Sequence, residues 1–405
     1  MASFPPPPVN TIDWSNVGFL VREVNGHIES HYSKKTGRWS PLRWVTDPYI
    51  RIHGMAPALN YGQQAYEGLK AFRAPGDNGA IRIFRPDRNA ARMQHSAEFI
   101  SIPPVPTELF LEAVKAAVSL NAEFVPPHET GAAMYIRPQI YGSSAQLGLS
   151  PPDEYTFAVY VLPTGVYHGT HPVKALILDD FDRAAPNGTG SAKVGGNYAP
   201  VLRWSDKARA SGYGITLHLD SATHEEVDEF STSGFIGALD DGRGGVTLVV
   251  PDSKNVIDSV TSDSIQQIGR SFGWKVEKRQ IKYAELPNFT EIMAAGTAAA
   301  LVPIRSITRR MGASDPKSLA AQVKQHPRLE VGGGEETISY MAASQDDAGP
   351  LCLRLLAQLQ GIQLGRVKDE FGWCVAVSQE DGARVEGAAD RAAKGSNGHT
   401  VDQLD

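Results

Sequence analysis

The sequence predicts a two-domain α+β protein, and three observations support this fold class. The chain has 405 residues, 41% of them apolar, whereas a single hydrophobic core usually stops growing at about 250–300 residues. Segments with the two-residue alternation of strands and segments with helical spacing occur in both halves of the sequence. Their order is mixed, which argues against a doubly wound parallel sheet.

The first half combines strands with amphipathic helices. Residues 81–84 (IRIF) alternate like a strand, and FRPDRNAARMQHSAEFI then has apolar or small residues at helical spacing, with Pro86 suited to a first helical turn. A second helix, ELFLEAVKAAVSLNAEF, is predicted from residue 108. Two runs rich in β-formers, at 134–142 and 155–163, predict strands.

A loop of turn residues separates this half from a second strand-rich series, which begins with VKALIL at residue 173. GITLHLD, GFIGAL and VTLVV predict short strands, and TSDSIQQIGRSFGW and GPLCLRLLAQLQ predict helices. The last residues are polar and rich in Gly, Ala and Asp, which predicts a disordered tail. The expected division is a smaller N-terminal α+β domain at 1–163, an interdomain loop at 164–172, a larger domain at 173–378 and the tail at 379–405.

Charge and cysteine content exclude several classes of protein. The net charge is -6 and the positive charges are scattered, so we expect small-molecule partners rather than nucleic acid or a membrane surface. The two cysteines, Cys352 and Cys374, form no CxxC pair, which argues against a disulfide framework or a zinc site and for a reducing compartment. The N-terminal MASFPPPPVN lacks the pattern of a targeting signal. The longest near-apolar run, 293–304, falls short of the ~20 residues that a spanning helix needs, and we expect a cytoplasmic protein without bound metal.

Lys193 stands among small residues in GSAKVGGNY, residues 190–198. A phosphate-binding loop of the GxxxxGK[ST] type would need a glycine before the lysine and a hydroxyl after it, but Ala192 and Val194 occupy those positions. A lysine desolvated among small residues can have a lowered pKa and react as an amine with an aldehyde. A solvated surface lysine is the alternative.

Several separated motifs follow one another in a specific order. They are LNYGQQAYEGLKAF (59–72), IFRPDRNAARM (83–93), MYIRP (134–138), AAPNGTGSAKVGGNYAP (184–200), EFSTSGFIG (229–237), VTSDS (260–264), GTAAALVPI (296–304) and FGWCV (371–375). With this ordered set, the chain from about residue 50 to 378 resembles the fold-type IV pyridoxal-phosphate enzymes, and among them the branched-chain amino acid aminotransferases. The resemblance implies the two-domain architecture of the D-amino-acid-aminotransferase-like fold, with pyridoxal 5'-phosphate bound in the larger domain.

The resemblance implies roles for two residues in the chemistry. Lys193 matches the lysine that carries the cofactor and afterwards moves a proton from the substrate Cα. Glu229 matches the carboxylate that keeps the ring nitrogen of the cofactor protonated, which the ring needs in order to draw electrons from Cα. Glu225, Glu226 and Asp228 lie in the same acidic run and are the alternatives for this role.

Further matches imply a phosphate cradle and a contact to the cofactor hydroxyl. Arg92 matches the phosphate-binding cation, with Arg85 and Arg88 as alternatives on the same segment. The resemblance adds the backbone amides of Val260 and Thr261, the hydroxyl of Thr297, and Tyr198 as the partner of the cofactor O3′.

Substrate-binding positions also follow from the resemblance. An aromatic box would comprise Tyr61, Tyr66, Tyr135 and Tyr167. Arg137 matches the residue that helps to bind the second carboxylate of glutamate, although an arginine after a β-run is otherwise most often part of a surface ion pair. The backbone amides of Thr297 and Ala298 would bind the α-carboxylate.

The chain departs from the family pattern at Gly234, at Asp258 and Ser259, and at Ser262. The leading hypothesis is transamination between an L-amino acid, branched-chain or otherwise hydrophobic, and 2-oxoglutarate, by a homodimer. The alternatives are a lyase like aminodeoxychorismate lyase, an aminotransferase of secondary metabolism with another amino donor, and an interaction module that has lost the cofactor. Arg137 and the spacing of the first two motifs argue against the lyase.

Overall fold

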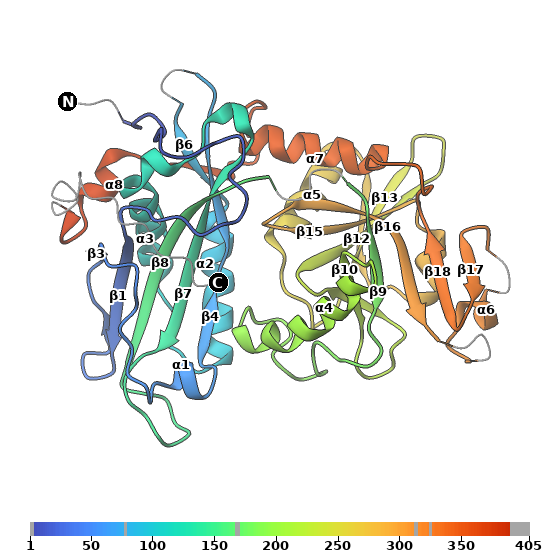
Figure 1. Cartoon of the computed structure of the whole chain (residues 1–405), viewed down its shortest axis with the longest axis horizontal. Coiled ribbons are helices and arrows are strands. Elements are labelled where there is room, and N and C mark those ends of the chain that lie inside the picture. Colours follow the sequence, from blue (N-terminus) through green and yellow to red (C-terminus); the bar gives the residue numbers. More distant parts are fainter. Residues whose placement is uncertain (1–3, 77–78, 167–170, 312–314, 324–325, 389–405) are drawn as a thin grey trace. The chain divides into compact units, whose positions relative to one another are not determined.

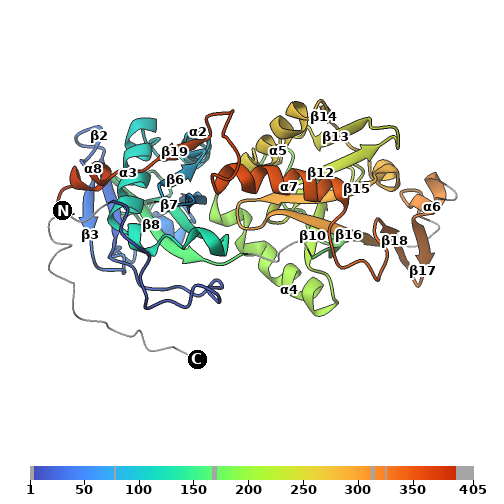
Figure 2. The ribbon, with the colours of Figure 1, turned by 90° about the horizontal axis from the view of Figure 1, so that it is seen from above.

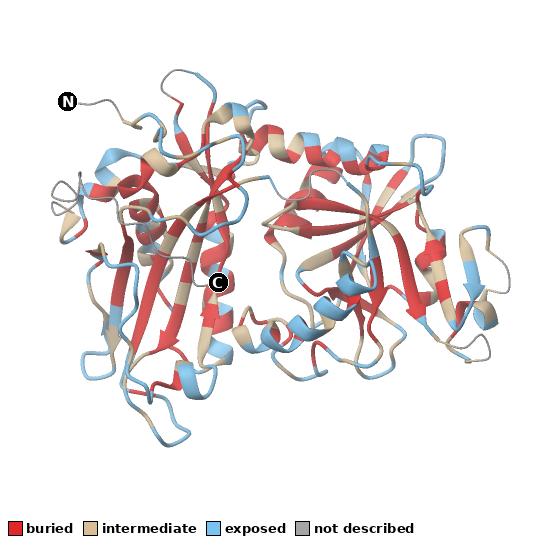
Figure 3. Cartoon of the chain, in the orientation of Figure 1, coloured by how far each residue is buried: buried red, intermediate tan, exposed pale blue. Residues whose placement is uncertain are grey.

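The computed structural model describes residues 4–76, 79–166, 171–311, 315–323 and 326–388 (Figure 1). These residues form two compact units. Unit 1 lies within Met1–Ala91, Ser101–Gly165 and Gly372–Asp405, and unit 2 within Arg92–Ile100 and Val166–Phe371. Each unit is built on its own sheet, and Figure 3 shows that burial is concentrated in the strands of each sheet.

Unit 1 contains an antiparallel sheet whose described strands follow the order β19-β6-β5-β7-β8-β1-β2, with β3 paired to β1 and β4 paired to β7. The predicted strands at 81–84, 134–142 and 155–163 are confirmed as β6, β7 and β8. The strands are β1 (His27–Ser33), β2 (Arg38–Trp39), β3 (Arg43–Val45), β4 (Gln64–Tyr66), β5 (Leu69–Arg73), β6 (Ile81–Phe84), β7 (Ala133–Gly142), β8 (Glu154–Thr164) and β19 (Cys374–Ala376).

The two predicted helices of the first half are also confirmed. They are α2 (Pro86–Phe99), whose residues from Arg92 onward belong to unit 2, and α3 (Thr107–Leu120) of unit 1. Unit 1 also holds α1 (Pro57–Asn60), α8 (Gln379–Ala383) and the 3₁₀ turns at Ala122–Phe124 and His128–Thr130. The apolar face of α3 packs on the sheet, where the rings of Phe110 and Phe157 lie 5.9 Å apart and both side chains are fully buried. Burial of one such ring contributes about 1.5–3 kcal/mol relative to exposure.

The expected disordered tail from residue 379 is wrong for its first residues. Residues 379–383 form α8, which begins with a capping box between Ser378 and Asp381. The Asp381 carboxylate also forms an ion pair with Lys115 of α3 at 2.6 Å. A polar composition predicts disorder when nothing fixes the segment, but here caps and a salt bridge stabilise the short helix. Residues 389–405 lie outside the described residues.

Unit 2 contains a sheet that closes on itself. Its described strands are β9 (Val173–Ile177), β10 (Ile215–Leu219), β11 (Val227–Phe230), β12 (Ser233–Asp240), β13 (Val246–Pro251), β14 (Lys275–Arg279), β15 (Glu291–Gly296), β16 (Ala300–Arg310), β17 (Leu329–Gly332) and β18 (Glu335–Ser339). The pairings run β12-β11-β10-β9-β16-β15 and return to β12, which makes a barrel. The near-apolar run 293–304 is therefore the β15–β16 hairpin.

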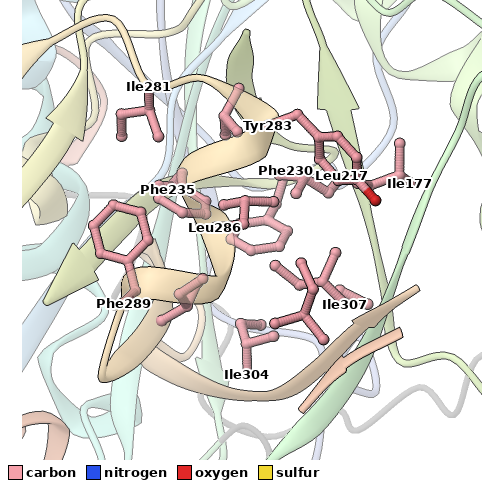
Figure 4. Close-up of a cluster of buried hydrophobic side chains, with 14 of the residues drawn as sticks. Ile177, Leu217, Phe230, Phe235, Ile281, Tyr283, Leu286, Phe289, Ile304 and Ile307 are labelled. Carbon is pink, nitrogen blue, oxygen red and sulfur yellow. The ribbon is translucent and has the colours of Figure 1, made fainter. Parts of the chain in front are cut away.

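The core of unit 2 is aromatic and aliphatic, and Figure 4 shows the rings of Phe230, Phe235 and Phe289 together. The centroids of Phe230 and Phe235 are 5.8 Å apart, and those of Phe235 and Phe289 are 6.1 Å apart. Gly237 of β12 is required by this packing, because a Cβ there would overlap the Phe289 ring. A ring therefore fills the space that a side chain on the strand would occupy.

Helices α4 (Leu202–Ala210), α5 (Val260–Ser271) and α7 (Pro350–Gln363) lie around this barrel, as Figure 2 shows from above, and α6 (Leu319–Gln322) lies beside β17. The unit also has the 3₁₀ turns η3 (Gly195–Asn197), η4 (Ala199–Val201) and η5 (Tyr283–Asn288). Helix α7 begins at the buried carboxylate of Glu291, which accepts hydrogen bonds from the Leu351 and Cys352 amides at 3.0 and 2.9 Å. None of the described helices has the length and apolar character that crossing a bilayer requires.

Candidate active site

Lys193 lies in a loop of unit 2 whose shape is fixed by Asn197. The side-chain nitrogen Nδ2 of Asn197 donates to the carbonyls of Thr189 at 2.7 Å and Ala192 at 2.8 Å. The Thr189 hydroxyl donates in return to Asn197 Oδ1 at 2.8 Å. Asn197 itself is buried. These bonds close the chain around Lys193 into a compact turn, so the lysine is presented from an ordered loop rather than from a flexible one.

The side chain and the backbone of Lys193 are both engaged. The Lys193 amine donates to the hydroxyl of Tyr198 at 3.0 Å, and it lies 4.9 Å from the centroid of that ring. The Lys193 backbone N–H donates to the hydroxyl of Ser96, on α2, at 2.8 Å. Lys193 is half-buried, which argues against the alternative of a freely solvated surface charge.

Glu229 is a buried carboxylate on β11, with 4% of its surface exposed. It forms an ion pair with the guanidinium of Arg183 and accepts a hydrogen bond from the Ile257 amide at 3.2 Å. Burial raises the pKa of Glu229 to about 7, while the charge of Arg183 and the Ile257 amide act in the opposite direction.

Arg183 connects three segments around this carboxylate and was not predicted from the sequence. Its Nη2 also donates to the carbonyls of Gly190 at 2.9 Å and Asn255 at 2.8 Å. Gly190 belongs to the Lys193 loop, and Asn255 precedes α5. The sequence signal was weak, since a single arginine after the acidic run DDFD looks like a surface ion pair.

The three alternatives to Glu229 have other environments. Glu225 is exposed, and Glu226 forms an ion pair with Lys282 at 2.6 Å near the surface. Asp228 is buried, and burial raises its pKa, but its side-chain hydrogen bonds go to Ser253 and Asn255. The register of β11 against β10 shifts between Val227 and Phe230, and within this irregular stretch Asp228 bonds side chains of the 253–255 segment while Glu229 takes Arg183 and the Ile257 amide.

Val260 and Thr261 are the first residues of α5, where the backbone amides of a helix are open to an anion. The N-cap Ser259 accepts a hydrogen bond from the Ser262 amide at 3.1 Å. Arg92 donates to the Asp258 carbonyl, just before α5, at 2.9 Å. The guanidinium of Arg92 is thus fixed at the same helix start.

Arg85 and Arg88, the alternatives to Arg92, are grouped with unit 1. The guanidinium of Arg85 lies 4.9 Å from the ring centroid of Trp373. Thr297 and Ala298 occupy the tight turn between β15 and β16 in unit 2.

The departures from the family pattern are neighbours in space. A Cβ added at Gly234 would lie 3.3 Å from the Cβ of Ser259 and 3.7 Å from that of Ser262. Gly234 therefore leaves room for the two serines at the start of α5. Gly234, Ser259 and Ser262 thus lie together at the start of α5, where Ser259 caps the helix.

In unit 1, Arg137 of β7 lies beside two aromatic rings. Its guanidinium carbon is 5.0 Å from the ring centroid of Tyr66 and 5.2 Å from that of Tyr135, and its Nη2 donates to the Tyr135 hydroxyl at 3.4 Å. Gly68 admits the Tyr135 hydroxyl, because a Cβ at residue 68 would overlap it. Tyr61 is not part of this group: it is 46% exposed and donates to the Leu147 carbonyl.

Tyr167 lies outside the described residues. The other predicted site residues therefore fall into two sets. Unit 2 holds the set predicted for cofactor and α-carboxylate: Arg92, Lys193, Tyr198, Glu229, Val260, Thr261, Thr297 and Ala298. Unit 1 holds the set predicted for the substrate side chain: Tyr61, Tyr66, Tyr135 and Arg137.

The donor set of unit 2 fits pyridoxal phosphate. A phosphate needs a cation and N–H donors, and Arg92 and the start of α5 provide them. A protonated ring nitrogen needs a carboxylate, and Glu229 is buried in the same unit. An aldehyde needs an amine, and the Lys193 amine is half-buried beside a phenol.

Comparison with known proteins shows the family to which the chain is similar. A family model described as amino-transferase class IV matches residues 64–307. Aminotransferase poxL of Penicillium oxalicum is 53% identical over 376 residues, which cover 93% of this chain and 96% of that protein. Branched-chain amino acid aminotransferase gloG of Glarea lozoyensis is 46% identical, and the match covers 93% of this chain and 99% of that protein.

A solved structure of the branched-chain amino acid aminotransferase from Escherichia coli superposes with a TM-score of 0.64. Its identity is 21%, and the match covers 87% of this chain and 99% of that one. This likeness confirms the fold-type IV architecture. The chain thus belongs to the class IV aminotransferases, pyridoxal 5'-phosphate enzymes that transfer amino groups between amino acids and 2-oxo acids.

Proposed function

We propose that this aminotransferase moves the amino group of a branched-chain or otherwise hydrophobic L-amino acid to 2-oxoglutarate. The observation that carries the proposal is Arg137, a guanidinium flanked by the rings of Tyr66 and Tyr135. The rings offer apolar contact to an aliphatic side chain, and the guanidinium offers a partner to a carboxylate. Its Nε is buried and has no hydrogen-bond partner among the described residues. The name of the gloG relative supports the same substrate class.

Bound pyridoxal phosphate supplies an electron-withdrawing ring that makes the substrate Cα–H acidic. In our proposal Lys193 would hold the cofactor, and its amine would take the proton from the substrate Cα. The Tyr198 hydroxyl, 3.0 Å from the Lys193 amine, orients that amine and would help to hold the cofactor through its O3′. Glu229, paired with Arg183, supplies the negative charge that keeps the ring nitrogen protonated.

Arg92, the amides of Val260 and Thr261 and the hydroxyl of Thr297 bind the phosphate in this proposal. The amides of Thr297 and Ala298 take the α-carboxylate of the substrate. Tyr66, Tyr135 and Arg137 form the substrate side of the proposal together with Tyr167, which lies outside the described residues, whereas Tyr61 is exposed and stands apart from them.

We further propose that the active form is a homodimer in the cytoplasm. Large apolar side chains are exposed on the loop around residue 147 and on α1 of unit 1, and a hydrogen bond from the Gln146 amide to the Met55 carbonyl, just before α1, connects the two segments. The exposed fractions are 75% for Leu147, 87% for Leu149 and 60% for Leu59. Exposed apolar groups that gather in this way are typical of an interface. Cys352 and Cys374 are free thiols, as in a reducing compartment.

Replacing Lys193 tests the assignment of the amine. Lys193→Ala should abolish turnover while the protein stays folded, because the loop is held by Asn197 and not by the lysine side chain. Borohydride treatment of the native protein should attach the cofactor to the peptide that contains Lys193, as seen by mass spectrometry. A label on Lys207 would refute the assignment.

Glu229→Gln should still bind the cofactor but slow transamination by about 100-fold or more, since the charge that sustains the electron sink is lost. The measurement is the rate of each half-reaction in a stopped-flow spectrometer. Asp228→Asn is the matched control, a buried carboxylate next in sequence whose partners are Ser253 and Asn255 rather than Arg183, and should keep most of the activity. A slow control and a fast Glu229→Gln variant would move the role to Asp228.

Arg137→Leu should weaken binding of 2-oxoglutarate by about 10- to 150-fold, the equivalent of ~1.5–3 kcal/mol for a hydrogen bond to a charged group. The half-reaction with L-leucine, which has no distal carboxylate, should change little. Arg137→Lys keeps the charge but loses the planar fork, so its loss should be intermediate. Equal losses for both substrates would show that Arg137 is structural.

Sedimentation analysis of the active enzyme should give the mass of a dimer. Replacement of Leu147 and Leu149 together by Ser should shift the protein toward the monomer, since it removes exposed apolar area from the proposed interface. A fully active monomer of the native protein contradicts the proposal.

A further inference from the structure

Ser96, in the second half of α2, lies between two residues of the candidate site. It is fully buried. Its hydroxyl accepts a hydrogen bond from the Lys193 backbone N–H at 2.8 Å and donates one to the Arg92 carbonyl at 2.9 Å. One oxygen therefore connects the backbone of the lysine with the helical turn that carries the arginine.

The contact with Lys193 is more than the local bond that helical serines often make. A serine within a helix commonly donates to the carbonyl four residues earlier, as Ser96 does to Arg92, and such a bond stays within one turn of the helix. The lone pair of Ser96 is used for an amide 97 residues further along the chain. The adjacent His95 adds a second contact to the same loop, with its Nε2 3.1 Å from the Ser191 hydroxyl.

The other bonds of the loop do not replace this contact. Asn197 joins residues within the loop, Thr189 and Ala192, and so fixes its shape. Arg183 binds the carbonyl of Gly190, and Gly190 lies three residues before Lys193. Ser96 holds the Lys193 residue itself on α2, which also carries Arg92.

We propose that Ser96 is a positioning residue that fixes Lys193 relative to Arg92. This inference rests on the proposed roles of both residues, which would bind two neighbouring substituents of one cofactor ring, the aldehyde carbon and the phosphate. A rigid ligand needs a constant separation between its two anchors, and displacement of a reacting group by about 1 Å can cost on the order of 100-fold in rate. A buried hydroxyl bonded to both backbones supplies such a constraint.

Hydrogen–deuterium exchange of the cofactor-free protein tests the contact without any catalysis. In Ser96→Ala the Lys193 amide loses its acceptor, and we expect the peptide that contains it to exchange on the order of 10-fold faster. Ser119→Ala is the matched control, because Ser119 is a buried helical serine of unit 1 that donates to a carbonyl at 2.8 Å. It should leave exchange at the Lys193 peptide unchanged. Unchanged exchange in Ser96→Ala would overturn the inference.

The kinetics of the holoenzyme test the positioning role. Ser96→Ala should lower kcat by about 10- to 100-fold with little change in KM for the amino donor, because the lysine is misplaced while the substrate contacts remain. A normal kcat, or a loss confined to KM, would refute the role. If Ser96→Ala does not fold, Ser96→Cys, close in size and a weak acceptor, should show both effects in smaller measure.

These outcomes can be separated from failure of the proposed function. Borohydride labelling of another lysine would refute the role of Lys193, whereas the exchange result would still report whether Ser96 holds that amide. Labelling of Lys193 together with normal kcat in Ser96→Ala would leave the proposed function intact and overturn the inference.

Discussion

The ion pair between Arg183 and Glu229 is the interaction on which the candidate site of unit 2 depends. Glu229 is 4% exposed, and burial alone would favour its neutral form. Arg183 opposes that effect, and its remaining hydrogen bonds go to the Gly190 and Asn255 carbonyls. Removing one partner of such a buried pair typically costs about 3–5 kcal/mol. The Lys193 loop, the barrel strand β11 and the segment before α5 are therefore coupled through one guanidinium.

This coupling changes how the small residues around Lys193 are interpreted. Small residues around a lysine can leave room for a ligand to approach the backbone. Gly190 instead permits contact between two parts of the chain, because a Cβ there would overlap the Asn255 carbonyl and the Ala184 methyl group. Gly196, in contrast, has open space where a Cβ would lie. The glycine-rich pattern thus combines a packing requirement at one position with openness at another, and the sequence alone does not separate them.

The parts of the fold that the sequence predicted are those with strong local periodicity, such as β7, β8 and α3. The ordered motifs predicted the family for the same reason, since each motif is a local string. The remainder depends on long-range contacts. Arg183 reaches Glu229 and Asn255 across 46 and 72 residues. Closure of the barrel requires β15 to pair with β12, and α8 depends on the ion pair with Lys115. Local composition contains no signal for such partners.

The same physical reasoning explains why one arginine can stand in an aromatic surface of unit 1. A guanidinium taken out of water loses the free energy of its hydration. The rings of Tyr66 and Tyr135, whose centroids lie 5.0 and 5.2 Å from the guanidinium carbon, offset part of that loss through cation–π attraction. The Nε remains without a hydrogen-bond partner among the described residues, and a buried unsatisfied donor costs about 1–3 kcal/mol. A ligand carboxylate would remove that cost, while an aliphatic side chain would contact the rings and leave it in place. In our proposal this surface therefore favours an acceptor with a second carboxylate without excluding an apolar donor, which is the asymmetry that two kinds of substrate would require.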